Sequence, residues 1–180
     1  MNSEELSFES EKKERPDGRK TQAIIDGLNM AFLRNDGIAR LSDVIEISKR
    51  ISKDYFKYEI IADASARHRI DNRVEFERLV KNGKIVLSPA GIEADDLIWM
   101  RARSLYEMGY EVSIISNDMF PLRRSEEENI PILSVTVSRF NDGRIYFLTR
   151  RHKAPFQAKH KPMNTEICFV GINAQLSLPA

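Results

Sequence analysis

The sequence predicts an α/β protein with a central, mainly parallel sheet and helices on both of its faces. Short apolar runs that resemble buried strands alternate with segments of helical period as far as residue 116. Strand–helix alternation of this kind is typical of a parallel sheet covered by helices. The chain has 180 residues, of which 42% are hydrophobic and 31% charged, and this suits one globular domain with tails.

The first predicted element is a strand at residues 21–26, an apolar run that stops at a carboxylate. A loop with a short helical turn is expected over 29–40. Residues 42–52 carry apolar side chains three and four positions apart, which predicts a helix with Ser42 as its N-cap. A further apolar run predicts the second strand at 58–63.

Asn72 and Glu75 have capping-box spacing, so a helix is predicted over 72–81. A short third strand is expected at 84–87. The longest helical pattern covers residues 93–108. Trp99 and Met100 flank the apolar stripe of this helix, and we expect both to pack in the core rather than to stack on a base.

Gly109 is a typical helix stop, and the apolar run after it predicts the fourth strand at 111–116. Residues 119–128 are polar and are expected to be helical in part. Two late strands are predicted at 132–137 and 144–148, joined by an Asn-Asp-Gly turn. They either add to one edge of the sheet or continue it.

The domain organisation has three parts. Residues 1–20 are rich in charged side chains and form a leader, and residues 149–180 form a basic extension punctuated by proline. The folded domain is expected between them, over 21–148. The N-terminus is polar and no apolar run approaches the roughly 20 residues that span a bilayer, so we expect a cytoplasmic protein without membrane contact. The single cysteine excludes an internal disulfide and a zinc finger within this chain.

Three aspartates from separate segments are expected to meet at the carboxyl edge of the sheet, where ligands bind in open α/β folds. Asp26 and Asp118 follow strands, and Asp95 opens the core-facing stripe of the longest helix. Carboxylates held close together repel one another, and a bound divalent cation removes this repulsion. Oxygen ligands favour Mg²⁺ or Mn²⁺, and such a site suits phosphoryl chemistry. Asp96 and Asp63 are expected beside it, as outer or second-metal groups.

A plainer interpretation remains open for each acid. Asp26 could end its strand with its carboxylate bound to backbone N–H groups. The acids at 93, 95 and 96 could simply complement the dipole of their helix. In the catalytic interpretation, Asn29 and Asn117 position a water molecule or a phosphate. Other phosphate chemistries fit less well, because the chain has no P-loop, no G-x-G-x-x-G motif and no G-x-S-x-G elbow.

At these residues the sequence resembles the NYN branch of the PIN-like nucleases. Two signatures carry the resemblance most directly: Ile25-Asp26-Gly27-Leu28-Asn29-Met30-Ala31 and Ser116-Asn117-Asp118 with Phe120. Two further segments are similar to stand-alone prokaryotic members of the Regnase-like group, whose animal relatives carry a CCCH zinc finger: Ala62-Asp63-Ala64-Ser65 with Arg67-His68, and Ser88-Pro89-Ala90-Gly91 with Glu93-Ala94-Asp95.

The resemblance implies a Rossmann-like PIN fold and a Mg²⁺-dependent endoribonuclease. By motif position it implies catalytic roles for five residues: Asp26, Asn29, Asp95, Asp96 and Asp118. PIN-like domains often pair, so a homodimer is an expectation from the resemblance. The chain departs from the animal proteins because no CCCH finger follows the domain. The basic stretch that often follows the second signature is reduced to Arg123-Arg124.

Basic side chains near the predicted crevice are expected to contact RNA, preferably single-stranded. These are Arg67, His68, Arg123, Arg124, Arg150, Arg151 and Lys153. Their alternatives are ion pairs, with Asp63 or Asp71 for the 67–69 segment, or a solvated tail beyond 149. Because the net charge is only +1, binding of a polyanion needs such local patches.

Three functional hypotheses follow. The first is a metal-dependent endoribonuclease that prefers single strands. The second is a catalytically silent RNA-binding or adaptor module, which is disfavoured because an acidic cluster without metal repels a polyanion. The third is a nuclease that acts on structured DNA, although such enzymes usually carry more acids than can be placed here.

Overall fold

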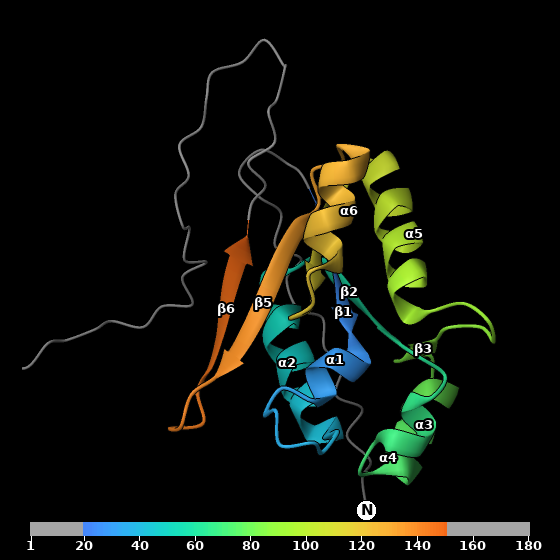
Figure 1. Ribbon diagram of the computed structural model, residues 1–180, viewed down its shortest axis with the longest axis vertical. Helices are drawn as coiled ribbons and strands as arrows, with labels where there is room; N and C mark the ends of the chain where they lie inside the picture. Colours follow the sequence, from blue (N-terminus) through green and yellow to red (C-terminus); the bar gives the residue numbers. More distant parts are fainter. Residues whose placement is uncertain (1–19, 151–180) are drawn as a thin grey trace, which may run out of the picture.

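The computed structural model describes residues 20–150, and these form one α/β unit (Figure 1). The strands are β1 (Thr21–Asp26), β2 (Lys57–Ala62), β3 (Val86–Leu87), β4 (Glu111–Ile115), β5 (Leu133–Arg139) and β6 (Ile145–Arg150). The helices are α1 (Gly27–Ala31), α2 (Leu41–Asp54), α3 (Ala66–Arg69), α4 (Arg73–Lys81), α5 (Ala94–Glu107) and α6 (Phe120–Glu128).

All six strands lie in one sheet, in the order β3-β2-β1-β4-β5-β6. Every neighbouring pair is parallel except β5 and β6, which are antiparallel and form a hairpin. The chain leaves β1 toward β2 on one side and later returns to β4 on the other, so the strand order reverses between β1 and β4. The predicted fold class, a mainly parallel α/β sheet with helices on both faces, is confirmed, and the reversal of strand order marks the crevice where ligands bind in open α/β folds.

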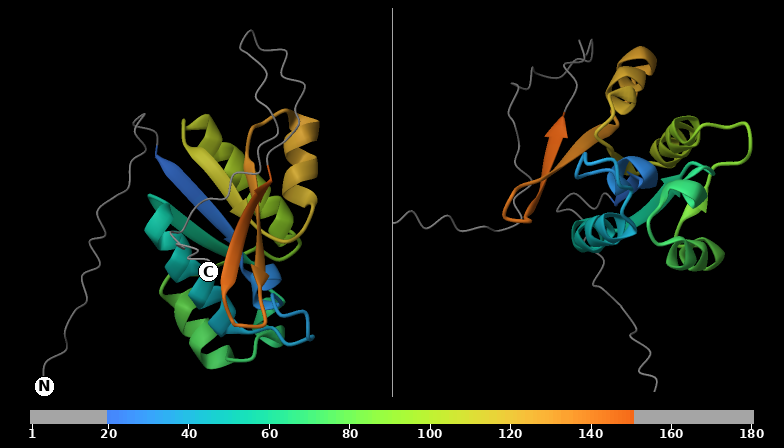
Figure 2. Two further views of the ribbon diagram at one scale, coloured as in Figure 1. Left: turned by 90° about the vertical axis from the view of Figure 1, so that its left-hand side faces the viewer. Right: turned by 60° about the horizontal axis from the view of Figure 1, so that its bottom comes forward.

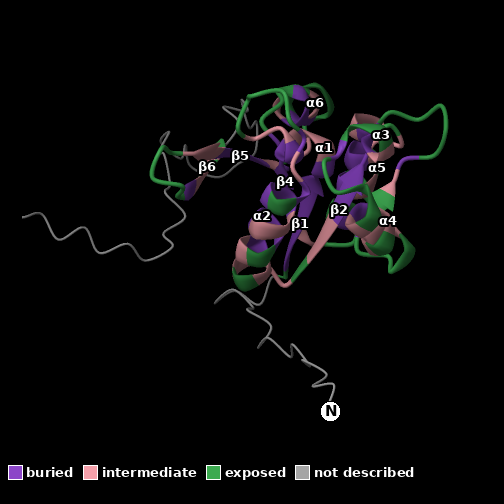
Figure 3. Cartoon of the chain, turned by 90° about the horizontal axis from the view of Figure 1, so that it is seen from below, coloured by how far each residue is buried: buried purple, intermediate pink, exposed green. Residues whose placement is uncertain are grey.

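Each face of the sheet has its own layer of helices. Adjacent residues of the central strand point to opposite sides, since Ile25 packs with α1, α2 and α4 while Ile24 packs with α5 and α6. Both side chains are fully buried, as expected for a parallel strand covered on both faces. Figure 2 shows the two layers from other directions, and Figure 3 shows the buried strands between more exposed helices.

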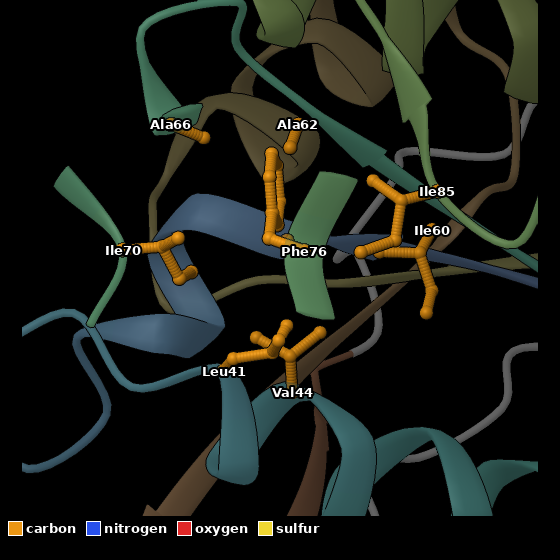
Figure 4. A pocket seen from close by; sticks show the side chains of 9 residues that line it. Leu41, Val44, Ile60, Ala62, Ala66, Ile70, Phe76 and Ile85 are labelled. Atoms are coloured by element: carbon orange, nitrogen blue, oxygen red, sulfur yellow. The ribbon is translucent and has the colours of Figure 1, made fainter. Parts of the chain in front are cut away.

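The turn after β1 is tighter than the sequence predicted. Helix α1 starts at Gly27, directly after the strand, where a loop was expected from residue 29. A Cβ on Gly27 would lie 3.1 Å from the Ile60 side chain and 3.2 Å from the Ile61 carbonyl oxygen, so glycine lets α1 sit directly on β2. Below this turn, apolar side chains surround Phe76 and line a wholly apolar hollow that belongs to the core (Figure 4).

The predicted and observed element ends agree to within about two residues, and two of the differences have a clear structural cause. Ser42 does not cap α2, because the helix begins at Leu41 and its backbone N–H donates to Asp71, 30 residues away, at 3.0 Å. Strand β3 starts at Val86 rather than at residue 84, because the N–H groups of residues 84 and 85 bond back to the C-terminal turn of α4. Asn72 caps α4 as predicted, by accepting from the Glu75 N–H.

Three further expectations concern the outer parts of the fold. Trp99 is buried as predicted, but Met100 is exposed because it points away from the sheet, so its expected core packing is wrong. The sheet continues to Arg150, two residues past the predicted domain end. The remainder of the predicted leader and basic extension lies outside the described residues. Within residues 20–150 no helix is long and apolar enough to cross a membrane.

Candidate active site

Asp26 lies at the carboxyl end of β1, where the strand order of the sheet reverses. Its side chain is buried, with 4% of the residue exposed, and both carboxylate oxygens accept hydrogen bonds. Oδ1 accepts from the Asn29 backbone N–H at 3.1 Å, and Oδ2 accepts from the Ser116 hydroxyl at 3.0 Å. Burial, with smaller contributions from the charges of Asp95 and Asp118, raises the pKa of Asp26 to about 6 against the effect of these two bonds.

The Asn29 side chain joins the ends of β1 and β4. Its Nδ2 donates to Asp118 Oδ2 at 3.2 Å, and its Oδ1 accepts from the Asn117 backbone N–H at 2.9 Å. Ser116 makes a second link, because its hydroxyl oxygen also accepts from the Asp118 N–H at 3.2 Å. The carboxylates of Asp26 and Asp118 are therefore held by neutral polar groups from the opposite strand end.

The Asn117 side chain bonds to the neighbouring strand β5. Its amide nitrogen donates to the Val137 carbonyl at 2.9 Å, and its amide oxygen accepts from the Val137 N–H at 2.7 Å. Through these two bonds, the Asn117 side chain continues the hydrogen bonding between β4 and β5 past the last paired backbone residues. Both polar ends of the amide are thus occupied, and contact of Asn117 with nucleic acid or water stays a prediction.

Asp95 lies in the first turn of α5 and is half-buried. The phase of the helix is as predicted, since Ile98, Ala102 and Leu105 are buried on the same stripe. Within residues 20–150 the Asp95 carboxylate makes no hydrogen bond or ion pair. Burial raises its pKa, the charge of Asp118 raises it further, and nearby Arg124 partly offsets both.

The two flanking acids each have a partner. Asp96 forms an ion pair with Arg124 of α6, which joins the two helices on this face of the sheet. Asp63 follows β2 and accepts from the Ser65 backbone N–H at 2.7 Å, and its hydrogen bonds with Ser65 lower its pKa. Neither acid forms a bond with the central three within the described residues.

Within residues 20–150, no group of three or more acidic, histidine or cysteine side chains is arranged to hold a metal ion. The predicted sharing of one ion by Asp26, Asp95 and Asp118 is therefore not preformed. Both oxygens of Asp26 and one oxygen of Asp118 accept from protein donors. The remaining donor set is still composed of oxygen, which is the chemistry that Mg²⁺ requires.

The predicted basic contacts have varied surroundings. Arg67 forms an ion pair with Glu77 at 3.2 Å, rather than with Asp63 or Asp71. His68 is exposed, and Arg123 lies 4.0 Å from Glu127. Arg150 contacts the Met119 sulfur at 3.0 Å. Arg151 and Lys153 lie outside the described residues, and RNA contact by any of these side chains stays a prediction.

Ser116 is the site residue that sequence reasoning missed. It is fully buried and connects Asp26 with Asp118, yet it was treated only as part of a signature. A signal was present, because a serine at the end of an apolar strand facing a buried aspartate can supply a hydroxyl donor.

The chain was compared with known proteins in three ways. No protein-family model matches it, and no curated protein matches it. One solved structure that it resembles is described as "Crystal Structure of T5 D15 Protein Co-crystallized with Metal Ions", with 16% sequence identity and a TM-score of 0.40. The matched region covers 71% of this chain and 57% of that one, so the chain spans little more than half of that protein.

Proposed function

We propose that this chain is a nuclease that hydrolyses phosphodiester bonds in RNA with the aid of Mg²⁺ or Mn²⁺. The observation that carries the proposal is the state of Asp95. Its carboxylate is half-buried, has no partner within the described residues, and faces the charge of Asp118. An unpaired carboxylate in this position is unfavourable unless a cation or a donor from a ligand joins it.

A divalent cation also explains how an acidic cluster could serve a polyanionic substrate. Without a metal, the charges of Asp26, Asp95 and Asp118 would repel a phosphate backbone. Mg²⁺ usually binds through one or two carboxylates and keeps several waters, so three direct ligands are not needed. Asp95 and Asp118 would hold the ion, with Asp26 beside them. A bound metal of this kind supplies an activated water and offsets negative charge on the reacting phosphate.

The other residues of the site position these acids. Asn29 holds the carboxylate of Asp118, and Ser116 holds that of Asp26 while binding the backbone next to Asp118. Because these supports are neutral, they fix the carboxylates without cancelling the negative charge that attracts a cation. Arg124 pairs with Asp96 and acts electrostatically on Asp95, so it is a positive charge close enough to the cluster to contact a substrate phosphate.

The choice of RNA, and of single strands in particular, is supported by the resemblance of the two signature motifs to the NYN branch. The test is a cleavage panel of single-stranded RNA, duplex RNA, single-stranded DNA and flap DNA, each with Mg²⁺, with Mn²⁺ and with EDTA. We expect cleavage of single-stranded RNA with either metal and none with EDTA.

Three single substitutions test whether cleavage depends on the carboxylates of the proposed site. Asp95→Asn and Asp118→Asn each remove one charge from the cluster and should reduce cleavage at least 100-fold, on the scale of losing a metal ligand. Asp36→Asn is the matched control, because Asp36 is an exposed loop carboxylate paired with Arg40, and it should cleave at the parental rate. Parental cleavage by both site variants contradicts the proposal. Metal-independent RNA binding without cleavage would identify a silent binding module instead, and preference for flap DNA would change the substrate.

A further inference from the structure

The proposed site leaves one face of the β5–β6 hairpin without a role. Side chains alternate along β6, and Ile145 and Phe147 pack on the core shared with α2. Tyr146, Leu148 and Arg150 therefore point to the opposite side. The hairpin stands out at the edge of the sheet (Figure 2), and 38% of Leu148 is exposed there.

An aromatic pair occupies the tip of this face. The rings of Phe140 and Tyr146 meet edge to face, with centroids 4.7 Å apart and an interplanar angle of 67°. Phe140 is 58% exposed, so its ring presents much of its surface to solvent. The guanidinium of Arg144, which also pairs with Asp142, lies 5.7 Å from the centre of the Tyr146 ring. Exposed rings beside cations are the surfaces on which nucleic-acid bases stack.

The other end of the face touches the residue that follows Asp118 in the chain. Arg150 contacts the sulfur of Met119 at 3.0 Å, and Met119 is the half-exposed residue directly after Asp118. No carboxylate within residues 20–150 pairs with Arg150. From Tyr146 to Arg150 the strand covers about 13 Å. The face thus runs from the aromatic pair to a contact with Met119, the chain neighbour of Asp118.

We propose that this strip, defined as Phe140, Tyr146, Leu148 and Arg150, binds the single-stranded RNA that extends from the scissile phosphate. The aromatic pair stacks on bases, and Arg150 contacts the backbone. The proposal rests on the proposed nuclease function and adds the route of the strand. RNA is favoured over a second copy of the chain or an apolar segment, because Arg150 lies at one end of the strip, Arg144 lies beside Tyr146 at the other, and the strip presents ring surfaces rather than a continuous aliphatic patch.

The experiment measures binding separately from cleavage. The full chain with Asp118→Asn, in Mg²⁺, is titrated into a fluorescein-labelled single-stranded RNA, and anisotropy gives the Kd. In this background, Phe140→Ala and Tyr146→Ala should each weaken binding about tenfold, the usual effect of losing one stacking ring. Arg150→Ala should weaken binding. It should also reduce the slope of log Kd against log salt concentration by about 1, the value expected for one phosphate contact.

Controls separate the strip from general effects. Tyr106→Ala removes another partly exposed tyrosine, on α5, and should leave the Kd unchanged. Tyr146→Phe keeps the ring and should bind like the parent. Unchanged affinity in Phe140→Ala, Tyr146→Ala and Arg150→Ala overturns the proposal. So does a change that appears only in the monomer–dimer equilibrium, measured by light scattering, because the strip would then contact a second copy.

The two proposals fail in different ways. If the parent protein cleaves RNA with Mg²⁺ but the strip variants bind normally, only the inference about the strip is wrong. If no variant or parent cleaves any substrate, yet the strip variants lose RNA affinity, the strip is correct and the nuclease function is wrong. A single-stranded DNA arm of the same titration shows whether the strip distinguishes the two sugars.

Discussion

Replacing Asp26 by asparagine should stabilise the metal-free protein at neutral pH. Burial raises the pKa of this carboxyl from its ordinary 3.8 to about 6, so the folded state binds its proton more tightly than the unfolded state. At about 1.4 kcal/mol per pKa unit, keeping the charge buried costs about 3 kcal/mol above pH 6. Asparagine is neutral and can still accept from the Asn29 N–H, so it avoids this cost.

The pH dependence identifies the cause. Below about pH 4 the aspartic acid is protonated in both states, so Asp26→Asn and the parent should have nearly equal unfolding free energies. The advantage of the variant should grow between pH 4 and 6 and be complete above pH 6. The assay is urea unfolding of the full chain in EDTA at pH 4, 5, 6, 7 and 8, analysed by linear extrapolation.

A control substitution at Asp36 tests a carboxylate whose pKa is lowered, rather than raised, by its surroundings. The hydrogen bond from Arg40 lowers the pKa of exposed Asp36 to about 2, so Asp36→Asn should lower stability slightly at neutral pH rather than raise it. The account of Asp26 is refuted if Asp26→Asn is less stable than the parent at pH 8, or if its advantage does not change with pH. Either result would mean that the hydrogen bonds of the carboxylate outweigh its burial.

Three further substitutions test the scaffold of the site by chemical unfolding. Asp43→Asn should destabilise the protein by about 2 kcal/mol, because Asp43 is 1% exposed and its charge pairs with both Arg34 and Arg139, of which Arg139 keeps Glu46 as a partner; a loss below 1 kcal/mol contradicts this. Gly27→Ala should cost about 1–3 kcal/mol, because its Cβ meets the backbone of β2; unchanged stability would show that α1 can move away freely. Asn117→Ala should cost about 1–3 kcal/mol by leaving the Val137 N–H and carbonyl unpaired, and a parental midpoint would show that water replaces the side chain.

The alternation of strands and helices could be predicted because each strand of a covered parallel sheet is a short apolar run. The central strand illustrates this, since Ile24 and Ile25 are both buried but belong to different cores. Local caps such as Asn72 could also be predicted, because the donor lies three residues away. The cap of α2 could not, because Asp71 approaches Leu41 only in the folded chain.

The sequence was enough to predict which residues form the site, but not which hydrogen bonds they make. The apolar runs that end at Asp26 and just before Asp118 placed both acids at the same sheet edge, and helix phase selected Asp95. Sequence spacing carries no information about which donors satisfy each oxygen, so the roles of Ser116 and of the Asn117 side chain emerged only from the structure.

The most direct test of the central claim is the binding of Mn²⁺ to the full chain, measured from the loss of the free-ion signal in electron paramagnetic resonance. The parent protein and Asp36→Asn should bind Mn²⁺ equally, and Mg²⁺ should displace it. Asp95→Asn and Asp118→Asn should each bind at least tenfold more weakly. Equal Mn²⁺ affinity in all four proteins, or none in the parent, would contradict a metal site at Asp95 and Asp118 and with it the proposed nuclease.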